Sequence, residues 1–216
     1  GRSTVSVEDS QFINISSDYA PALYFEDSES SIINSRFVNL TAGRSAGAIA
    51  IRWSGDSYIQ GSEFTNTKSF KNAGAVIVDY GRKSCYAAII DCVFRNASSM
   101  IGGAFIQLGG GLFLADSKFI DNKASCDGGA VYVSFTTSVI QNCSFTSNDA
   151  GFSSDYIAYG GAIYCDKGYL ELVDSGFINN SAYLGNAIYS CDSWYDITDC
   201  IFANNTNAIY SDFDYR

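Results

Sequence analysis

The stretch GGAIYC, residues 160–165, returns in altered form at several other places in the chain. Residues 128–132 read GGAVY, residues 185–189 read GNAIY and residues 207–210 read NAIY. A short word that returns at a regular interval is typical of a solenoid, in which each repeat forms one structural unit stacked on the next. The recurrence therefore predicts, in the first place, a scaffold role for these residues.

A phenylalanine that precedes an Asn-rich stretch gives the period of the repeat. The members of this column are Phe12, Phe37, Phe64, Phe94, Phe119, Phe145, Phe177 and Phe202. Subtraction of their numbers gives separations of 25 to 32 residues. A period in this range predicts a solenoid with about 25 residues in each coil.

Four further columns accompany the phenylalanines. An aliphatic residue lies five positions before each Phe, and Ser or Cys lies two positions before it. Asp, Asn or Gly lies three positions before, and Asn or Asp lies two positions after, with Ser147 as the exception. Like residues form ladders when the coils of a parallel β-helix stack about 4.8 Å apart. We expect the aliphatic and Phe columns to fill the core, and the Asp, Asn and Gly columns to form turns, because these residues tolerate left-handed backbone angles.

The word GGAIY places its tyrosine on the outside of the coil. In every repeat an apolar residue follows the alanine, and we expect it to point inward. Because side chains alternate along a strand, the next residue then points outward. In the last four repeats that residue is Tyr132, Tyr164, Tyr189 or Tyr210. We predict that these rings form an exposed binding stripe; the alternatives are a core position or a position covered by a lateral loop.

Composition narrows the range of functions. The 216 residues are 47% hydrophobic with a net charge of −10, so the chain can bury a core and is a poor partner for nucleic acid. The absence of histidine excludes Ser-His-Asp and Cys-His catalysis and most zinc sites. No cofactor and no metal are expected. Residues 1–216 are predicted to form one domain, a fragment of a longer surface protein, with a looped-out insertion at residues 149–159.

The repeated sequence motifs resemble those of chlamydial polymorphic outer membrane proteins, in which G-G-A-[ILV] is paired with F-x-x-N. Residues 128–131 and 160–163 match the first motif, and residues 102–105 match it with Phe in the last place. The pairs that match the second motif are Phe119 and Asn122, Phe145 and Asn148, Phe177 and Asn180, and Phe202 and Asn205. The first four repeats depart from the pattern and read F-x-N. Similar repeats occur in adhesin-like surface proteins of methanogenic archaea and some parasitic protists. The resemblance implies a surface-exposed or secreted β-helix that mediates adhesion.

Acidic residues leave a second class of function open. β-Helix folds include polysaccharide lyases and hydrolases, which act through paired acids or through acids with calcium. Asp91 with Asp116, and Asp174 with Asp199, would be neighbours on adjacent coils. We interpret these acids as turn formers, because Asn or Gly occupies the same column in other repeats. A carbohydrate-active enzyme of pectate-lyase type is the alternative, and a structural unit of a surface layer or filament is a third possibility.

The seven cysteines include one candidate pair. Cys92, Cys143 and Cys200 share the Ser/Cys column with a serine coil between each two, a separation too large for disulfides. We predict that these three are buried free thiols. Cys165 and Cys191 follow GAIY words in consecutive repeats and could form a disulfide.

Six asparagines begin Asn-x-Ser/Thr sequons, which in a secreted chain can carry glycans. They are Asn14, Asn39, Asn96, Asn142, Asn179 and Asn204. Because five of them belong to the Asn column after Phe, we interpret them as members of an internal ladder that has no room for a sugar.

These observations together predict an all-β, right-handed parallel β-helix of about eight coils. The expected function is that of a non-catalytic adhesion or binding module at the cell surface or outside the cell. Its partner would be a protein or glycan on a host or neighbouring cell. End-to-end or lateral self-association is a further expectation.

Overall fold

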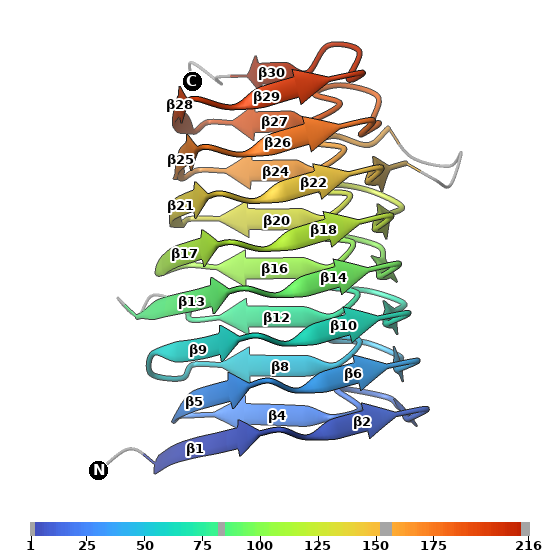
Figure 1. The fold of residues 1–216 in the computed structure, drawn as a ribbon, viewed down its shortest axis with the longest axis vertical. Coiled ribbons are helices and arrows are strands. Elements are labelled where there is room, and N and C mark those ends of the chain that lie inside the picture. The colour runs from blue at the N-terminus through green and yellow to red at the C-terminus, as the bar shows by residue number, and fades with distance from the viewer. Residues whose placement is uncertain (1–2, 82–84, 152–156, 213–216) are drawn as a thin grey trace.

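The structure is a computed structural model that describes residues 3–81, 85–151 and 157–212. These residues form a parallel β-helix that rises coil by coil from one end of the molecule to the other (Figure 1). Sheets A, B and D contain eight strands each, and sheet C contains six. The predicted fold is therefore confirmed, and the number of coils is close to the prediction. The described ranges contain no helical membrane span.

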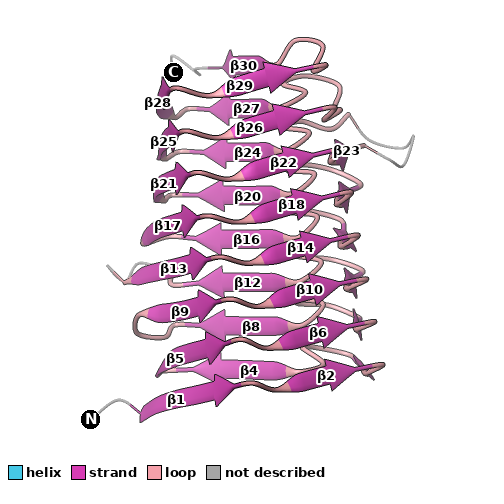
Figure 2. Cartoon of the chain, viewed as in Figure 1, coloured by secondary structure: helices cyan, strands magenta, loops and turns pink. Residues whose placement is uncertain are grey.

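A full coil contributes one strand to each sheet in the order A, B, C, D (Figure 2). Sheet A comprises β1 (Ser3–Glu8), β5 (Ser28–Ile33), β9 (Ser57–Gln60), β13 (Tyr86–Ile90), β17 (Gly111–Ala115), β21 (Thr137–Gln141), β25 (Tyr169–Val173) and β28 (Trp194–Thr198). Sheet B comprises β2 (Gln11–Ile13), β6 (Arg36–Val38), β10 (Glu63–Thr65), β14 (Val93–Arg95), β18 (Lys118–Ile120), β22 (Ser144–Thr146), β26 (Gly176–Ile178) and β29 (Ile201–Ala203).

The other two sheets complete each coil. Sheet C comprises β3 (Ser16–Ser17), β7 (Thr41–Ala42), β11 (Lys68–Ser69), β15 (Ser98–Ser99), β19 (Lys123–Ala124) and β23 (Asp149–Ala150). Sheet D comprises β4 (Leu23–Glu26), β8 (Ile49–Arg52), β12 (Val76–Asp79), β16 (Phe105–Leu108), β20 (Val131–Ser134), β24 (Ile163–Asp166), β27 (Ile188–Cys191) and β30 (Ile209–Asp212).

The phenylalanine column forms the centre of the core, as predicted. The six members from Phe37 to Phe177 are fully buried, whereas Phe12 and Phe202 in the end coils are partly buried. Neighbouring rings are stacked with centroids 4.7 to 5.0 Å apart. The aliphatic column lines the same core, with every member from Ile32 to Leu172 fully buried. Stacking thus keeps each ring in register with the ring of the next coil.

Two columns of left-handed residues bend the chain between sheets A and B and between sheets B and C. In the first column, from Asp9 to Asp199, φ lies between 47° and 58°. In the second, from Asn14 to Asn204, φ lies between 51° and 57°. Asn, Asp and Gly adopt this conformation more readily than other residues, which explains their recurrence at these corners.

The Ser/Cys column forms a hydrogen-bond ladder beside the phenylalanines. The Ser35 hydroxyl accepts a hydrogen bond from the Ser10 N–H at 3.2 Å and donates one to the Ile33 carbonyl at 2.9 Å. The Cys92 and Cys143 thiols occupy equivalent positions and are buried and free, as predicted. Cys200 is also free, but it is only partly buried because it lies in the last coil.

The glycines of the GGAIY word are required where the chain enters sheet D. Gly160 has φ of 69°, in the left-handed region. A Cβ on Gly161 would lie 2.1 Å from the carbonyl oxygen of Asn186 in the next coil. The scaffold interpretation is therefore confirmed. Because sheet C adds a strand of two residues, the GAIY strand is the fourth strand of a full coil.

Candidate functional site

The four tyrosines of sheet D point away from the core, as predicted. The residues on either side of Tyr132, Val131 and Val133, are fully buried. From Tyr132 to Tyr210 the neighbouring rings stack with centroids 5.0, 5.3 and 5.5 Å apart and interplanar angles of 3°, 11° and 12°. Because each ring covers the face of its neighbour, this tyrosine stripe presents ring edges and hydroxyl groups rather than ring faces.

Neighbouring segments cover part of the tyrosine stripe. Tyr210 is 39% exposed, but Tyr189 is only 6% exposed. The ring of Tyr159, at the end of the 149–159 segment, lies 4.6 Å from that of Tyr189. At the other end, Tyr132 packs against a small second apolar cluster on the outside of sheet D. A lateral covering, one of the two alternatives to an exposed stripe, is thus present in part.

Three hydroxyl groups of the tyrosine stripe, those of Tyr132, Tyr164 and Tyr189, stay protonated. Burial, followed by the charges of Asp166 and Asp127, raises the pKa of Tyr132 to about 12. Burial also raises the pKa of Tyr164 and of Tyr189, whose hydroxyl donates a hydrogen bond to Asp212 at 3.4 Å. At neutral pH these groups are hydrogen-bond donors, not anions.

The expected disulfide between Cys165 and Cys191 is absent, and both thiols are free. In the pairing of β24 with β27, Cys165 lies opposite Ser190, one position before Cys191. Cys165 is fully buried in the core, whereas Cys191 is partly exposed. Since successive side chains point to opposite faces of a strand, the two sulfur atoms lie on opposite sides of sheet D. The predicted disulfide is therefore wrong, because the two cysteines are offset by one position in the pairing of the two strands.

An aromatic hollow lies at the corner between sheets D and A, next to the tyrosine stripe. Its principal residues, which we call the corner notch, are Phe135, Lys167 and Asp192 at the corner and Tyr169 and Trp194 at the start of the following strands. The hollow has a volume of about 380 Å³. Trp194 is 73% exposed and Phe135 is 66% exposed. The Lys167 ammonium lies 5.7 Å from the centre of the Phe135 ring.

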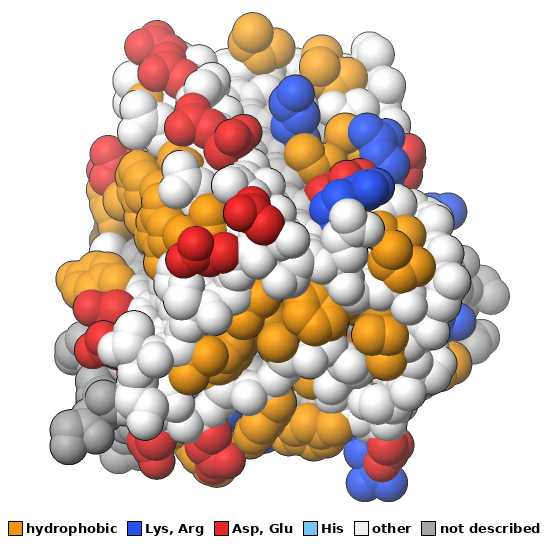
Figure 3. Space-filling view, turned by 60° about the horizontal axis from the view of Figure 1, so that its bottom comes forward, with side chains coloured by type: hydrophobic (Ala, Val, Ile, Leu, Met, Phe, Trp, Pro, Cys, Tyr) orange, Lys and Arg blue, Asp and Glu red, His pale blue; other side chains and the backbone are white. Residues whose placement is uncertain are grey.

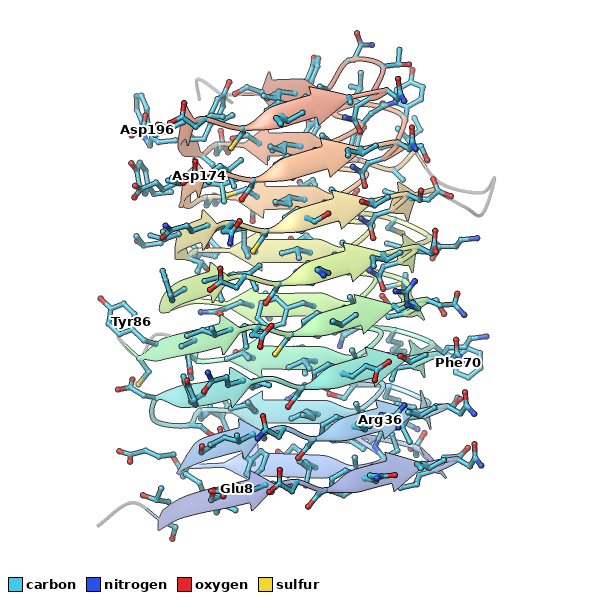
Figure 4. The ribbon with its side chains drawn as sticks, viewed as in Figure 1. Glu8, Arg36, Phe70, Tyr86, Asp174 and Asp196 are labelled. Carbon is cyan, nitrogen blue, oxygen red and sulfur yellow. The ribbon has the colours of Figure 1, made fainter. Side chains whose placement is uncertain are left out.

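Acidic groups border the corner notch. The Tyr169 hydroxyl donates a hydrogen bond to Asp196 at 2.6 Å. Figure 4 shows Asp196 at the left edge of the C-terminal coils, on the side of the molecule where sheet D turns into sheet A. The notch therefore combines apolar rings with the Lys167 ammonium and the Asp192 carboxylate, and Asp196 lies beside it.

Phe135 holds an unfavourable backbone conformation while its ring stays in solvent. Its φ is 53°, a region that is rare for bulky residues and costs about 1–2 kcal/mol for a residue with a Cβ. Asp27, Gly109 and Asp192 take the equivalent corner position in other coils. Trp53 is the other left-handed aromatic described there, with φ of 49° and 48% exposure. Backbone strain that is not offset by burial of the side chain is expected at positions where the side chain contacts a binding partner.

The paired acids lie in turns. Asp91, Asp116, Asp174 and Asp199 are exposed and left-handed, and Asp116 accepts a hydrogen bond from Asn142 at 2.7 Å. Among the residues that the structure describes, no group of three or more His, Cys, Asp or Glu is arranged to hold a metal ion. Acidic side chains are instead scattered between hydrophobic ones over the face shown in Figure 3.

The sequon asparagines are not the internal ladder, contrary to the expectation. All six are exposed at corners. The internal ladder lies one residue further along the chain, at Asn122, Asn148, Asn180 and Asn205. The Asn148 amide donates to Asn180 Oδ1 and to the Phe119 carbonyl, both at 3.0 Å. The F-x-x-N motif therefore marks the inward asparagine.

Phe135 and Trp194 were not identified from the sequence, because neither belongs to a repeat column. The one available signal was an aromatic residue at a corner where other coils have Asp or Gly. It could be recognised only after the corner between sheets D and A had been placed.

Comparison with known proteins bears on the fold. No curated protein matches the chain. The model of the family described as "Right handed beta helix region" matches residues 1–138, more than half of the chain. The matched part includes β1 and ends within β21. With its parallel coils and stacked core ladders, the chain belongs to the right-handed β-helix family.

Proposed function

We propose that the chain is a non-catalytic binding module, acting at the cell surface or outside the cell, that recognises a protein or glycan on another cell through the corner notch. The β-helix fold is compatible both with binding or surface modules and with pectate-lyase-like enzymes. The observation that carries the proposal is Phe135, whose ring is displayed to solvent from a strained backbone. Strained backbone positions cluster at binding sites, and together with the other aromatic residues of the notch a ring held in this way supports a contact outside the chain.

The composition of the notch supports recognition. Trp and Tyr are enriched among the residues that dominate binding energy at interfaces. Trp194 and Tyr169 are opposite each other on neighbouring strands, and Lys167 and Asp192 supply charges of both signs. The tyrosine stripe continues the surface around the corner, because Tyr132 precedes Phe135 by three residues and Tyr164 precedes Lys167 by three.

The geometry gives less support to catalysis. The paired acids serve as left-handed turn residues, and Asn or Gly takes the same position in other coils. A neutral Asn at this position would provide neither a general base nor a nucleophile. We therefore favour binding over polysaccharide cleavage.

The experiment is a binding screen of the chain on glycan arrays and intact cells, followed by affinity measurements on variants. Phe135→Asp and Trp194→Thr introduce residues found at the same positions of other coils, and each should weaken binding at least about tenfold. Trp53→Asp is the matched control, because it alters a left-handed aromatic at the same corner outside the notch.

The alternative outcomes are distinct. Unchanged affinity in both notch variants, with loss in Tyr164→Ser, would move the site to the tyrosine stripe. Release of unsaturated or reducing ends from polygalacturonate by the purified chain would contradict the binding proposal and favour the enzyme.

A further inference from the structure

The six sequon asparagines and the four asparagines of the internal ladder differ in their exposure. Every asparagine that begins a sequon is exposed at a corner of the solenoid. The internal ladder is buried or partly buried, and none of its members has Ser or Thr two residues later. Asn179 and Asn180 show the contrast directly, because they are adjacent, but only the exposed Asn179 begins a sequon.

Hydrogen bonding at the corner between sheets B and C leaves room for a substituent. The Nδ2 group of Asn39 donates to Asn14 Oδ1 at 3.0 Å, and that of Asn96 donates to Asn66 Oδ1 at 2.7 Å. An amide nitrogen carries two hydrogens, and each of these bonds uses one. The other can be replaced without loss of the ladder bond.

We propose that the exposed sequon asparagines are acceptor sites for N-linked glycans. In the transfer, the amide Nδ2 attacks the anomeric carbon of a lipid-diphosphate-linked oligosaccharide. The nitrogen–carbon bond forms, the bond from that carbon to the diphosphate oxygen breaks, and the lipid diphosphate leaves while Nδ2 gives up one proton. The folded solenoid can keep the product because each acceptor side chain faces solvent.

The placement of these asparagines is compatible with binding at the notch. Five of the six lie on the corner between sheets B and C, and Asn142 lies on the corner between sheets A and B. Figure 1 shows that the corner between sheets B and C lies on the opposite side of the molecule from the corner between sheets D and A. Glycans at most of these sites would therefore leave the corner notch open. The inference rests on the extracellular location in the proposed function, but not on the notch.

Coil spacing predicts unequal use of the six sites. Asn14 and Asn39 lie on neighbouring coils, as do Asn179 and Asn204. A separation of about 4.8 Å between coils leaves two neighbouring glycans crowded. Asn96 has no sequon on either adjacent coil of its corner, and the same holds for Asn142. We expect full modification at these two sites and about one glycan per pair at the others.

The test uses the chain directed into the secretory pathway of a eukaryotic cell and recovered from the medium. Enzymatic release of N-glycans in ¹⁸O-water converts each glycosylated Asn to labelled Asp, which peptide mass spectrometry locates. Label is expected at Asn96, at Asn142 and at one member of each pair, and not at the internal ladder. Six unlabelled sequons in secreted, folded protein would overturn the proposal.

Two matched variants test individual sites. Ser98→Ala keeps Asn96 and its ladder bond but removes the sequon, so the mass should fall by one glycan. Lys68→Thr completes a sequon at exposed Asn66, on the coil between those of Asn39 and Asn96, so label should appear at Asn66 at the expense of these two neighbours. Failure of either change would contradict the proposal. Because glycans are read by mass and the notch by affinity, failure here is distinguishable from failure of the proposed function.

Discussion

Phe135 adopts a left-handed conformation that suits Asn, Asp or Gly, and its ring remains in solvent. Phe135→Asn should therefore raise the free energy of unfolding, by about 1 kcal/mol, because Asn tolerates this conformation better. Urea denaturation of the variant and the parent chain measures the difference. A clear loss of stability would mean that the ring contributes packing, and the argument from strain would then fail.

Phe119 occupies the middle of the core ladder, between the stacked rings of Phe94 and Phe145. Phe119→Ala should lower the free energy of unfolding by about 3–5 kcal/mol, the usual range for a buried aromatic side chain. Ile120→Ala, at the adjacent outward position, is the control and should have a much smaller effect. Equal melting temperatures for Phe119→Ala and the parent chain would refute the register.

For single residues, the sequence predicts which side chains point into the core better than it predicts which side chains contact each other. The phenylalanines recur in every coil, so their common environment could be inferred. Cys165 directly follows Tyr164, but Ser190 separates Cys191 from Tyr189. Alternation along a strand places these two sulfur atoms on opposite faces. The same rule that placed the tyrosine stripe outside should have excluded the disulfide.

The internal asparagine ladder joins consecutive coils beside the core. Asn148 bonds to Asn122, to Asn180 and to the Phe119 carbonyl. Asn148→Ala leaves several of these buried groups without a partner and should lower the free energy of unfolding by about 2–3 kcal/mol. Thermal and chemical denaturation measures this loss, and the same measurements on a second variant, Asn66→Asp, provide the comparison.

In this comparison variant, the substituted residue Asn66 belongs to the exposed column of asparagines at the corner between sheets B and C, where its Oδ1 accepts a hydrogen bond from Asn96. Asp already occupies its column at Asp121, so we expect Asn66→Asp to change stability by less than about 1 kcal/mol. Equal losses in the two variants would mean that the internal ladder has no special role.

At the level of elements, the turns and long strands were predictable and the shortest strands were not. The strands of sheet C contain two residues each, too few for a periodic pattern. Asp149 and Ala150 form β23, so they are not part of a loop; residues 152–156 of the predicted insertion lie outside the described residues. A shift of one residue, from the second to the third position after Phe, separates an exposed ladder from a buried one.

The whole molecule should lose stability at alkaline pH because it buries thiols. Burial raises the pKa of both Cys92 and Cys143 from an ordinary value of 9.0 to about 12. Between these values the folded chain binds more protons than the unfolded chain, so stability present below pH 9 is lost as pH rises toward 12. A double variant, Cys92→Ser with Cys143→Ser, should lose less stability over this range. The measurement is the denaturation midpoint of the variant and of the parent chain at pH 8 and at pH 10.5. Equal losses of stability in the two proteins would contradict the prediction.

The fold of the whole chain was predictable because its information is repeated in every coil. The corner notch was not, because it depends on residues that differ from coil to coil and meet only after the solenoid has closed. Trp194 and Phe135 are 59 residues apart by their numbers, and no periodic pattern connects them. Repetition thus specifies the scaffold, and departures from repetition specify the candidate site.

The uniform register of the core ladders has a consequence for the history of such a chain. Phe94 pairs with Phe119, and Phe119 pairs with Phe145, in the same strand alignment. A coil therefore meets the coil below and the coil above through equivalent positions. If a recombination event inserted or removed the DNA for one complete coil, the remaining coils could restack without any new contact having to arise. Length can then change in steps of one coil, while the residues that differ between coils diverge independently.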